Sequence, residues 1–293
     1  MRLRSGERFV PSDEAKICAE SFGRPTDPAI LLICGAAGSM DFWEDEFCSR
    51  IAQAERFVIR YDLRDTGRST NYPVGEPGYT SADLEADALA VLDGFGVDTA
   101  HVFGVSMGGA IAQRLALDHP ERVAGLILQS TSPAVAGGED RPDLPPMESR
   151  LATVFDGDAP DPDWSDRTAA IGAMVEGERP FTGSVPFDAE RMRHIAASAY
   201  ARTADMAAMQ SNHWIAESGE TTNKRLSEIS APTLVMHGTE DPLFPYAHAA
   251  VIAEEIPNAR LVPLHGMGHQ YPPEPLWNVI IEEVIAHTAT VDT

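Results

Sequence analysis

The sequence feature that most constrains this fold is the segment Gly104-Val105-Ser106-Met107-Gly108. A dense apolar run precedes it, and apolar residues at helical spacing follow it, so the pattern predicts a strand, a sharp turn and a helix. A serine at the tip of such a turn needs nearly side-chain-free residues two positions before and after it, because the strand and the helix approach each other closely. Gly104 and Gly108 meet this requirement. The segment therefore favours a turn that holds the Ser106 hydroxyl exposed for reaction.

The alternative interpretation is a glycine-rich turn in which Ser106 only caps the following helix. The five-residue pattern occurs by chance in roughly one chain in ten of this composition, so the rest of the chain has to decide between the two.

Apolar runs alternate with helical patterns on both sides of this turn. Residues 30–34 form a continuous apolar run, as expected for a strand that helices cover on both faces. Residues 8–11 and 17–22, in contrast, are typical of an antiparallel hairpin at a sheet edge. The alternation predicts an α/β fold with a mostly parallel sheet flanked by helices. Further strands are expected at 57–61, 102–105, 123–129, 233–236 and 259–264, and helices at 41–54, from 80 or 81 to 92, at 247–256 and at 276–286.

The alternation stops between residues 133 and 228. This segment begins with loops rich in proline and aspartate, and helical patterns follow near 147–155, 168–178, 188–201 and 203–215. A loop of this length inside a compact domain is improbable unless it has structure of its own. We therefore expect residues 133–228 to form a helical cap inserted into a core of residues 1–132 and 229–293. A disordered linker is disfavoured by the methionine and tryptophan content of the second half.

Polar residues that follow the predicted strands form a candidate catalytic set. A serine hydroxyl becomes a good nucleophile only when a base takes its proton, and that base needs a carboxylate to orient it. Loops at the carboxyl ends of parallel strands converge at one edge of the sheet, so Ser106, Asp241 and His269 can meet there. Glu240 is an alternative to Asp241 as the acid, and His265 is an alternative to His269 as the base.

Serine chemistry of this kind also needs backbone N–H groups that stabilise the negative charge of a tetrahedral intermediate. The amide of Met107 begins the helix after the turn, where the helix dipole supports it. The second donor is expected in the loop after Cys34, and Ala36 is our choice.

Several motifs carry a family resemblance. They are LICG at 32–35, YDLRDTGRST at 61–70, ADALAVLD at 86–93, GVSMG at 104–108, GSVPFD at 183–188 and GMGH at 266–269. On these motifs the chain resembles the alpha/beta hydrolases over nearly its full length, with the serine, acid and histidine in the order that those enzymes use. It is particularly similar to the aclacinomycin methylesterase group, which removes a methyl ester from an anthracycline polyketide.

Two positions in these motifs are unusual for the superfamily. Most relatives carry glycine where Asp65 stands, which makes the 64–69 string more discriminating. Cys34 and Gly35 stand where many members have His-Gly, a departure that leaves a backbone donor possible. We expect Arg64, Asp65 and Arg68 to form a network of ion pairs and hydrogen bonds that stabilises their loop; the alternative is that they recognise the substrate.

Aromatic and methionine side chains could line a large apolar pocket between cap and core. Candidate substrate-binding residues are Trp43, Phe181, Trp214 and Tyr271. Any one of them could instead pack in the core, and we expect two or three to line the pocket.

Composition excludes several classes of partner. The net charge of -23 disfavours nucleic acid and anionic membranes. Three cysteines without C-x-x-C spacing disfavour disulfides and zinc. The acidic string at 156–163 lacks the glycine at position 6 of a calcium loop, and Arg167 stands where that loop needs a glutamate. No complete dinucleotide or P-loop motif occurs either, so we expect neither metal nor cofactor. No membrane span or signal region is evident, which favours a cytoplasmic protein. The sequence makes no prediction about the oligomeric state.

The expected function is hydrolysis of a carboxylic ester in a small-molecule substrate, through an acyl-enzyme on Ser106. The resemblance implies a bulky polycyclic methyl ester as the substrate type. The alternative is the same triad used for lactone hydrolysis, C–C bond hydrolysis or perhydrolysis. An alternative of another class is a non-catalytic small-molecule receptor on a hydrolase scaffold.

Overall fold

The computed structural model describes residues 4–138, 141–155, 162–219 and 222–289. Within them, the centre of the molecule is an eight-stranded sheet in the order β1-β2-β4-β3-β5-β6-β7-β8. β1 and β2 form the expected antiparallel hairpin at one edge, and the neighbouring strands from β4 across to β8 pair in parallel. The strands are β1 Arg8–Ser12, β2 Ala15–Phe22, β3 Ala29–Ile33, β4 Phe57–Tyr61, β5 Ala100–Val105, β6 Val123–Gln129, β7 Thr233–Gly238 and β8 Ala259–Leu264.

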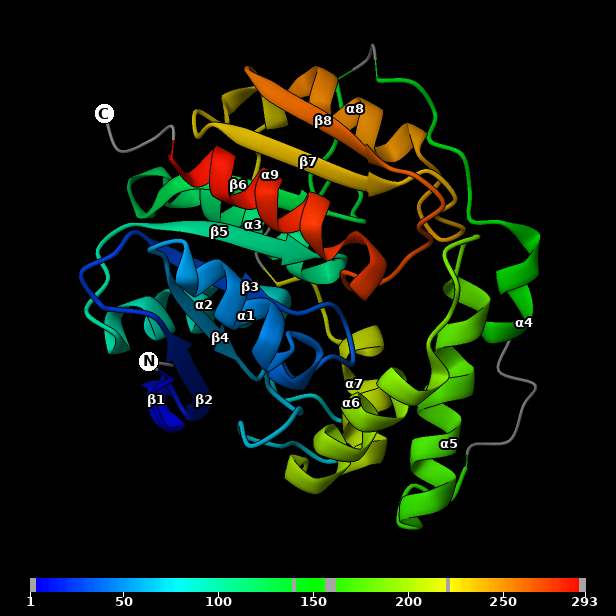
Figure 1. The fold of residues 1–293 in the computed structure, drawn as a ribbon. Coiled ribbons are helices and arrows are strands. Elements are labelled where there is room, and N and C mark those ends of the chain that lie inside the picture. Colours follow the sequence, from blue (N-terminus) through cyan, green and yellow to red (C-terminus); the bar gives the residue numbers. More distant parts are fainter. Residues whose placement is uncertain (1–3, 139–140, 156–161, 220–221, 290–293) are drawn as a thin grey trace.

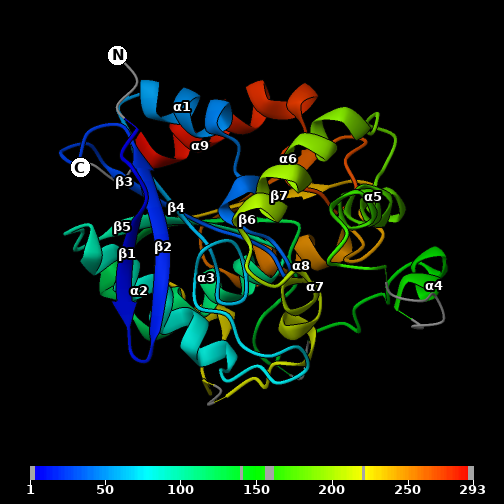
Figure 2. The same ribbon diagram turned by 90° about the horizontal axis from the view of Figure 1, so that it is seen from below.

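Helices cover both faces of this sheet (Figures 1 and 2). α1 and α9 pack against each other on one face, and α2, α3 and α8 lie on the other. β3 and β5 are buried along their whole length between these layers, which explains why the sequence of β3 is continuously apolar. The layered arrangement confirms the predicted α/β fold. The covering helices are α1 Asp45–Gln53, α2 Ser81–Gly94, α3 Met107–Asp118, α8 Ala247–Glu255 and α9 Trp277–Ala289.

In the described part of the chain, four further α-helices lie between β6 and β7 in the sequence. They flank the carboxyl ends of the parallel strands in Figure 1. α5 and α6 pack together around a second hydrophobic cluster that includes Ile171, Met174 and Met192. The helices are α4 Ala152–Phe155, α5 Arg167–Glu178, α6 Ala189–Arg202 and α7 Met206–Ile215. The division of the chain into core and cap stays a prediction.

Some helix boundaries differ from those expected. α1 begins at Asp45 and not at residue 41, because Met40–Phe42 form a separate 3-10 turn. α7 begins at Met206 and not at residue 203, because the Asp205 carboxylate accepts hydrogen bonds from the first amides of the helix. The helix expected at 147–155 is a 3-10 turn followed by the short α4. Most of the acidic string that begins at residue 156 lies outside the described residues.

No helix in the described part of the chain is both long enough and apolar enough to cross a bilayer.

The loop after β4 is fixed by ion pairs, as predicted. Arg64 forms two hydrogen bonds with the buried Asp87, at 2.8 and 2.9 Å. Arg68 pairs with Glu7 at 2.6 Å near the surface. The expected network around this loop is therefore confirmed, and its arginines bind carboxylates of the protein itself.

Asp65 lies at the centre of the same network. Its backbone has φ of 66°, which is uncommon for a residue other than glycine. Its carboxylate accepts hydrogen bonds from the Tyr79 hydroxyl at 2.7 Å, the Tyr72 amide at 2.6 Å and the Asn212 side chain at 2.9 Å. Asn212 belongs to α7, so Asp65 ties this helix to the loop after β4.

Replacing Asp65 by alanine is expected to lower the free energy of unfolding by about 2–4 kcal/mol, because several buried donors would lose their acceptor. Urea denaturation followed by circular dichroism measures this change. Asp13, which also has positive φ but is exposed in the β1–β2 turn, provides the matched control Asp13→Ala. Equal losses in the two variants would contradict the role assigned to the Asp65 carboxylate.

Candidate active site

Ser106 lies at the sharp turn between β5 and α3. Its backbone has φ of 55° and ψ of -120°, a strained conformation for a residue with a side chain. The two flanking glycines make the turn possible: a Cβ on Gly104 would lie 2.1 Å from the Gly108 carbonyl oxygen, and a Cβ on Gly108 would lie 2.5 Å from the carbonyl oxygen of Cys34. The close approach of strand and helix expected from the sequence is therefore present.

The His269 imidazole bridges Ser106 and Asp241. Its Nε2 lies 2.9 Å from Ser106 Oγ, and its Nδ1 lies 2.9 Å from Asp241 Oδ2. Because Nδ1 faces a carboxylate, it carries the ring proton, and Nε2 is left to accept the proton of the serine hydroxyl. The three side chains come from separate loops at the carboxyl ends of β5, β7 and β8.

Asp241 is held as a carboxylate by its surroundings. Its Oδ1 accepts hydrogen bonds from the amides of Leu243 and Phe244, at 2.9 and 2.8 Å. Burial alone would raise the pKa of this carboxyl, but the charge and hydrogen bond of His269, the charge of His237 and the Phe244 amide together lower the pKa below its ordinary value. Asp241 can therefore stabilise a protonated His269 ring.

The structure places the two alternative residues elsewhere. The Glu240 carboxylate accepts hydrogen bonds from the backbone amide and the hydroxyl of Ser184, at 2.6 and 2.8 Å. His265 is exposed at the surface. Of the four acid and base candidates, the structure brings only Asp241 and His269 together with Ser106.

Residues 35–38, which follow β3, line the same cavity as Ser106. The Gly35 amide donates to the Tyr271 hydroxyl at 2.7 Å, and the Ala37 amide donates to His213 Nδ1 at 2.9 Å. Between them, the Ala36 amide has no hydrogen-bond partner among the described residues. Ala36 and Ser106 line one cavity, and Met107 begins α3 directly after the serine. These two amides remain available to a ligand.

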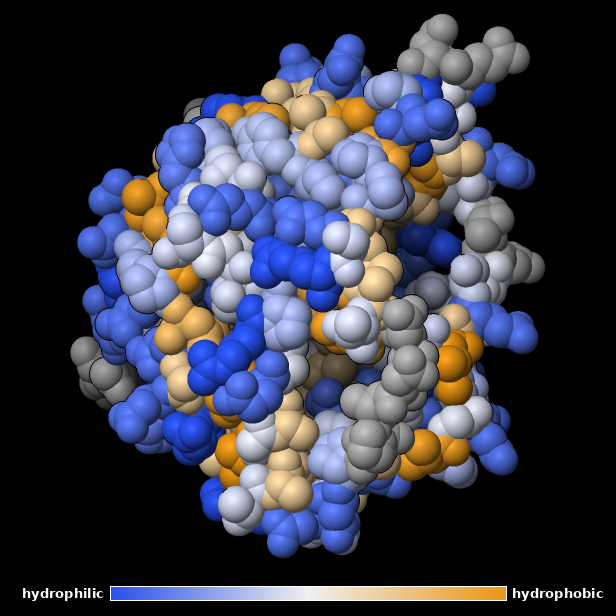
Figure 3. All heavy atoms as spheres, turned by 90° about the vertical axis from the view of Figure 1, so that its right-hand side faces the viewer, coloured by the Kyte–Doolittle hydropathy of each residue, from blue (hydrophilic) through white to orange (hydrophobic). Residues whose placement is uncertain are grey.

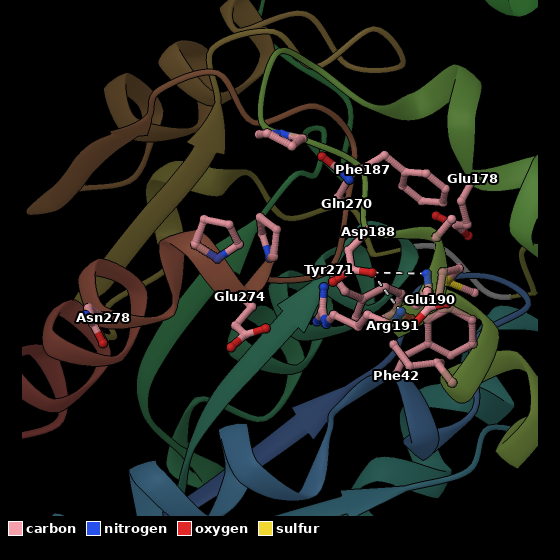
Figure 4. A pocket seen from close by; sticks show the side chains of 16 residues that line it. Phe42, Glu178, Phe187, Asp188, Glu190, Arg191, Gln270, Tyr271, Glu274 and Asn278 are labelled. Carbon is pink, nitrogen blue, oxygen red and sulfur yellow. Dashed lines mark hydrogen bonds between the residues drawn. The ribbon is translucent and has the colours of Figure 1, made fainter.

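One cavity adjoins this constellation, and a second cavity shares part of its lining with the first. The first has a volume of about 430 Å³ and is lined by Ser106, His269 and the loop 35–38. The second has a volume of about 700 Å³ and extends toward α9 (Figure 4). Five residues line both: Phe42, Glu178, Met192, Gln270 and Tyr271. Figure 3 shows the hollowed face of the molecule beside the inserted helices.

Three of the four predicted substrate-binding residues line the first cavity: Phe181, Trp214 and Tyr271. Trp43 is not among the lining residues of either cavity. Its side chain is fully buried, with its ring edge-on to Phe103 and to Tyr271 at 4.9 and 5.6 Å between centroids. The structure thus places Trp43 in the core, behind Tyr271, which corrects the expectation for this residue.

Glu178 is a cavity residue that the sequence analysis missed. It ends α5 at the junction of the two cavities, and Figure 4 shows its side chain beside Phe187. Burial raises the pKa of its carboxyl to about 7, although the charge of His269 opposes the rise. No sequence signal distinguishes Glu178 from its neighbour Glu176, which is exposed and paired with Arg179.

Replacing Glu178 by glutamine is expected to change how stability depends on pH. The folded-state pKa is raised, from 4.5 to about 7, so the folded protein binds more protons than the unfolded chain in this range and loses stability as pH rises through it. Glu178→Gln removes this loss, and its free energy of unfolding relative to wild type should rise by about 1–2 kcal/mol between pH 5 and pH 8. Urea titrations at both pH values measure the difference. Glu176→Gln is the matched control, and parallel pH curves for Glu178→Gln and wild type would contradict the expectation.

Comparisons with known proteins agree with this geometry. The family model described as "alpha/beta hydrolase fold" matches residues 28–270. The chain is 35% identical over 282 residues to "Rhodomycin D methylesterase DauP" from Streptomyces sp. (strain C5), covering 90% of this chain and 92% of the relative. It is 36% identical to "Rhodomycin D methylesterase DnrP" from Streptomyces peucetius, with the same coverage of 90% and 92%. A solved esterase from Rhodococcus sp. ECU1013 superposes with a TM-score of 0.75 at 21% identity, covering 98% of this chain and 100% of that one, and shows the fold.

Proposed function

The chain belongs to the alpha/beta hydrolase family, and we propose that this hydrolytic enzyme cleaves carboxylic esters with a triad of Ser106, His269 and Asp241. The observation that carries the proposal is the His269 ring, which lies within 2.9 Å of both the Ser106 hydroxyl and the Asp241 carboxylate. The strained turn at Ser106 supports it, because such strain is retained where exposure of a nucleophile requires it.

In this mechanism Ser106 Oγ attacks the ester carbonyl carbon while His269 Nε2 takes the hydroxyl proton. Asp241 holds the ring in orientation and stabilises the imidazolium. The tetrahedral intermediate collapses when His269 donates its proton to the leaving alkoxide, which departs as an alcohol and leaves an acyl-enzyme. His269 then deprotonates a water molecule, whose attack releases the carboxylic acid and restores Ser106.

The negative oxygen of each tetrahedral intermediate is assigned to the amides of Ala36 and Met107. Both are free to donate, and they lie on the two sides of Ser106, in the loop after β3 and at the start of α3. Preorganised donors of this kind contribute strongly because they need no rearrangement as the charge develops.

We assign the helices of residues 133–228 to a cap over the carboxyl edge of the sheet, with the substrate between cap and core. Phe181 and Trp214 of this segment and Tyr271 of the core line the first cavity. The two adjoining cavities, of about 430 and 700 Å³, suit a large ligand. Together with the rhodomycin D methylesterases among the relatives, these walls favour the methyl ester of a bulky aromatic polyketide as the substrate.

A panel of compounds tests this function. Aromatic polyketide methyl esters are expected to release methanol, whereas lactones, C–C cleavage substrates and peracid formation should give much lower turnover. Stoichiometric labelling of Ser106 by a fluorophosphonate separates an enzyme from a non-catalytic receptor. Turnover of lactones or diketones in place of every ester would overturn the ester assignment, and a lack of labelling would overturn the nucleophile.

A further inference from the structure

In residues 35–38 of the loop after β3, three of the four backbone amides donate a hydrogen bond within the described part of the chain. The Gly35 amide donates to the Tyr271 hydroxyl, the Ala37 amide to His213 Nδ1, and the Gly38 amide to the Gly35 carbonyl at 3.2 Å. The amide left over among these described residues belongs to Ala36, the proposed oxyanion donor. Its direction therefore depends on the two side chains that hold its neighbours.

Ala37 needs such support because its own backbone is strained. Its φ of 56° lies in the left-handed region, which an alanine adopts at a cost. The hydrogen bond to His213 offsets this cost at the residue directly after the proposed donor. A loop without it is expected to relax to other conformations, in which the Ala36 amide no longer points at the developing charge.

His213 can accept this hydrogen bond because its ring is neutral and its tautomer is fixed. Its Nε2 donates to the Arg64 carbonyl at 2.9 Å, which leaves Nδ1 unprotonated and facing the Ala37 amide. Burial lowers the pKa of the ring to about 4, although the charge of Asp65 and the Arg64 carbonyl oppose this. The ring is therefore neutral near pH 7, and Nδ1 is available there as an acceptor.

The helix that carries His213 is itself held in place. The side chain of the preceding residue, Asn212, donates to Asp65 and to the Pro73 carbonyl, and it accepts from the Gly75 amide at 2.9 Å. α7 thus contacts two core loops through buried hydrogen bonds. The inserted segment and the oxyanion loop are joined at this point.

We propose that His213, a residue of the inserted segment, is a positioning residue for the oxyanion hole, acting through the Ala37 amide on the adjacent Ala36 amide. This inference rests on the proposed function. With His213 in this role, catalysis requires that α7 packs in the position that the structure gives it. The segment 133–228 then contributes to the chemical step as well as to the walls of the cavity.

Two substitutions separate the two hydrogen bonds of the ring. In His213→Asn the side-chain oxygen can replace Nδ1 as the acceptor for Ala37, whereas in His213→Gln the side-chain amide can replace Nε2 as the donor to Arg64. We expect His213→Gln to lower kcat by about 10- to 100-fold with KM within about twofold of wild type, because the loss falls on stabilisation of the transition state. His213→Asn should retain kcat within about fivefold of wild type.

The matched control is His194→Gln, which makes the same replacement at an exposed position of the neighbouring α6. Stability is measured in parallel by urea denaturation, and kcat is expressed per molecule labelled by a fluorophosphonate. A boronic acid inhibitor forms a complex with Ser106 that mimics the tetrahedral intermediate. Its Kd for His213→Gln should exceed its Kd for wild type by the same factor as the loss in kcat/KM.

The outcomes distinguish this inference from the proposed function. Wild type that neither hydrolyses esters nor reacts with the fluorophosphonate would remove the proposed function. Active wild type with unchanged kcat in His213→Gln would overturn only the role of His213. Equal losses in the Gln and Asn variants that follow their losses of stability, or failure of both to fold, would assign His213 to structure alone and also overturn the inference.

Discussion

Replacing Ser106 by alanine is expected to lower kcat for ester hydrolysis by at least about 10⁴-fold, because no other group in the triad can form the acyl-enzyme. The fold should tolerate the change. The backbone conformation at φ of 55° places similar demands on serine and on alanine, and the side chain contributes only its hydrogen bond to His269. Steady-state turnover of an aromatic methyl ester, together with urea denaturation, measures both quantities.

A matched control for this substitution is Ser198→Ala, at an exposed serine on α6. Its turnover should equal that of wild type. If Ser106→Ala retained more than about one tenth of wild-type turnover, the nucleophile would have to be sought elsewhere, since loss of a triad serine ordinarily costs several orders of magnitude.

The second large effect is expected at the acid. Asp241→Asn should lower kcat by about 10³- to 10⁴-fold with little loss of stability. The amides of Leu243 and Phe244 both donate to Oδ1, so an asparagine would keep its oxygen there and turn its NH₂ group toward His269. His269 would then carry its proton on Nε2, facing Ser106, and would be unable to accept the serine proton.

Glu240→Gln is the control for this experiment, because it makes the same chemical change at the adjacent position. The Glu240 side chain contacts Ser184, away from His269, so turnover should stay within about threefold of wild type. A large loss in Glu240→Gln with normal turnover in Asp241→Asn would reverse the assignment of the acid.

Local sequence patterns predicted the bounds of several strands more accurately than the start of one helix. The strands at 57–61, 123–129 and 259–264 agree with β4, β6 and β8 residue for residue, because each is a mostly apolar segment with polar or turn residues on both sides of it in the sequence. The start of α7 was misplaced by three residues, because Thr203 and Asp205 are both acceptable helix caps and only the packed helix selects one of them.

The candidate site was predictable to a similar extent. The residues after β5, β7 and β8 could be chosen because parallel strands direct the loops at their carboxyl ends to one edge. The choice between Asp241 and Glu240 remained open in the sequence, since neighbouring residues on one loop point in different directions that the pattern does not encode. The prediction that Trp43 lines the pocket was wrong for a related reason. An aromatic residue near a cavity can face the cavity or lie behind another ring, as Trp43 lies behind Tyr271.

The sequence by itself determined the α/β fold, the strained turn at Ser106 and the small set of groups from which a triad can be built, because periodicity, glycine spacing and the succession of strands and helices along the chain are read from local sequence. Only the tertiary structure decided which side chains hold the oxyanion loop and which carboxyl at the cavity junction has its pKa raised by burial. His213 and Ala37 are 176 positions apart in the chain, and the burial of Glu178 comes from packing around it. Such contacts form when segments that are far apart in the chain pack against each other. The residues that flank each partner in the sequence therefore carry no signal for the contact.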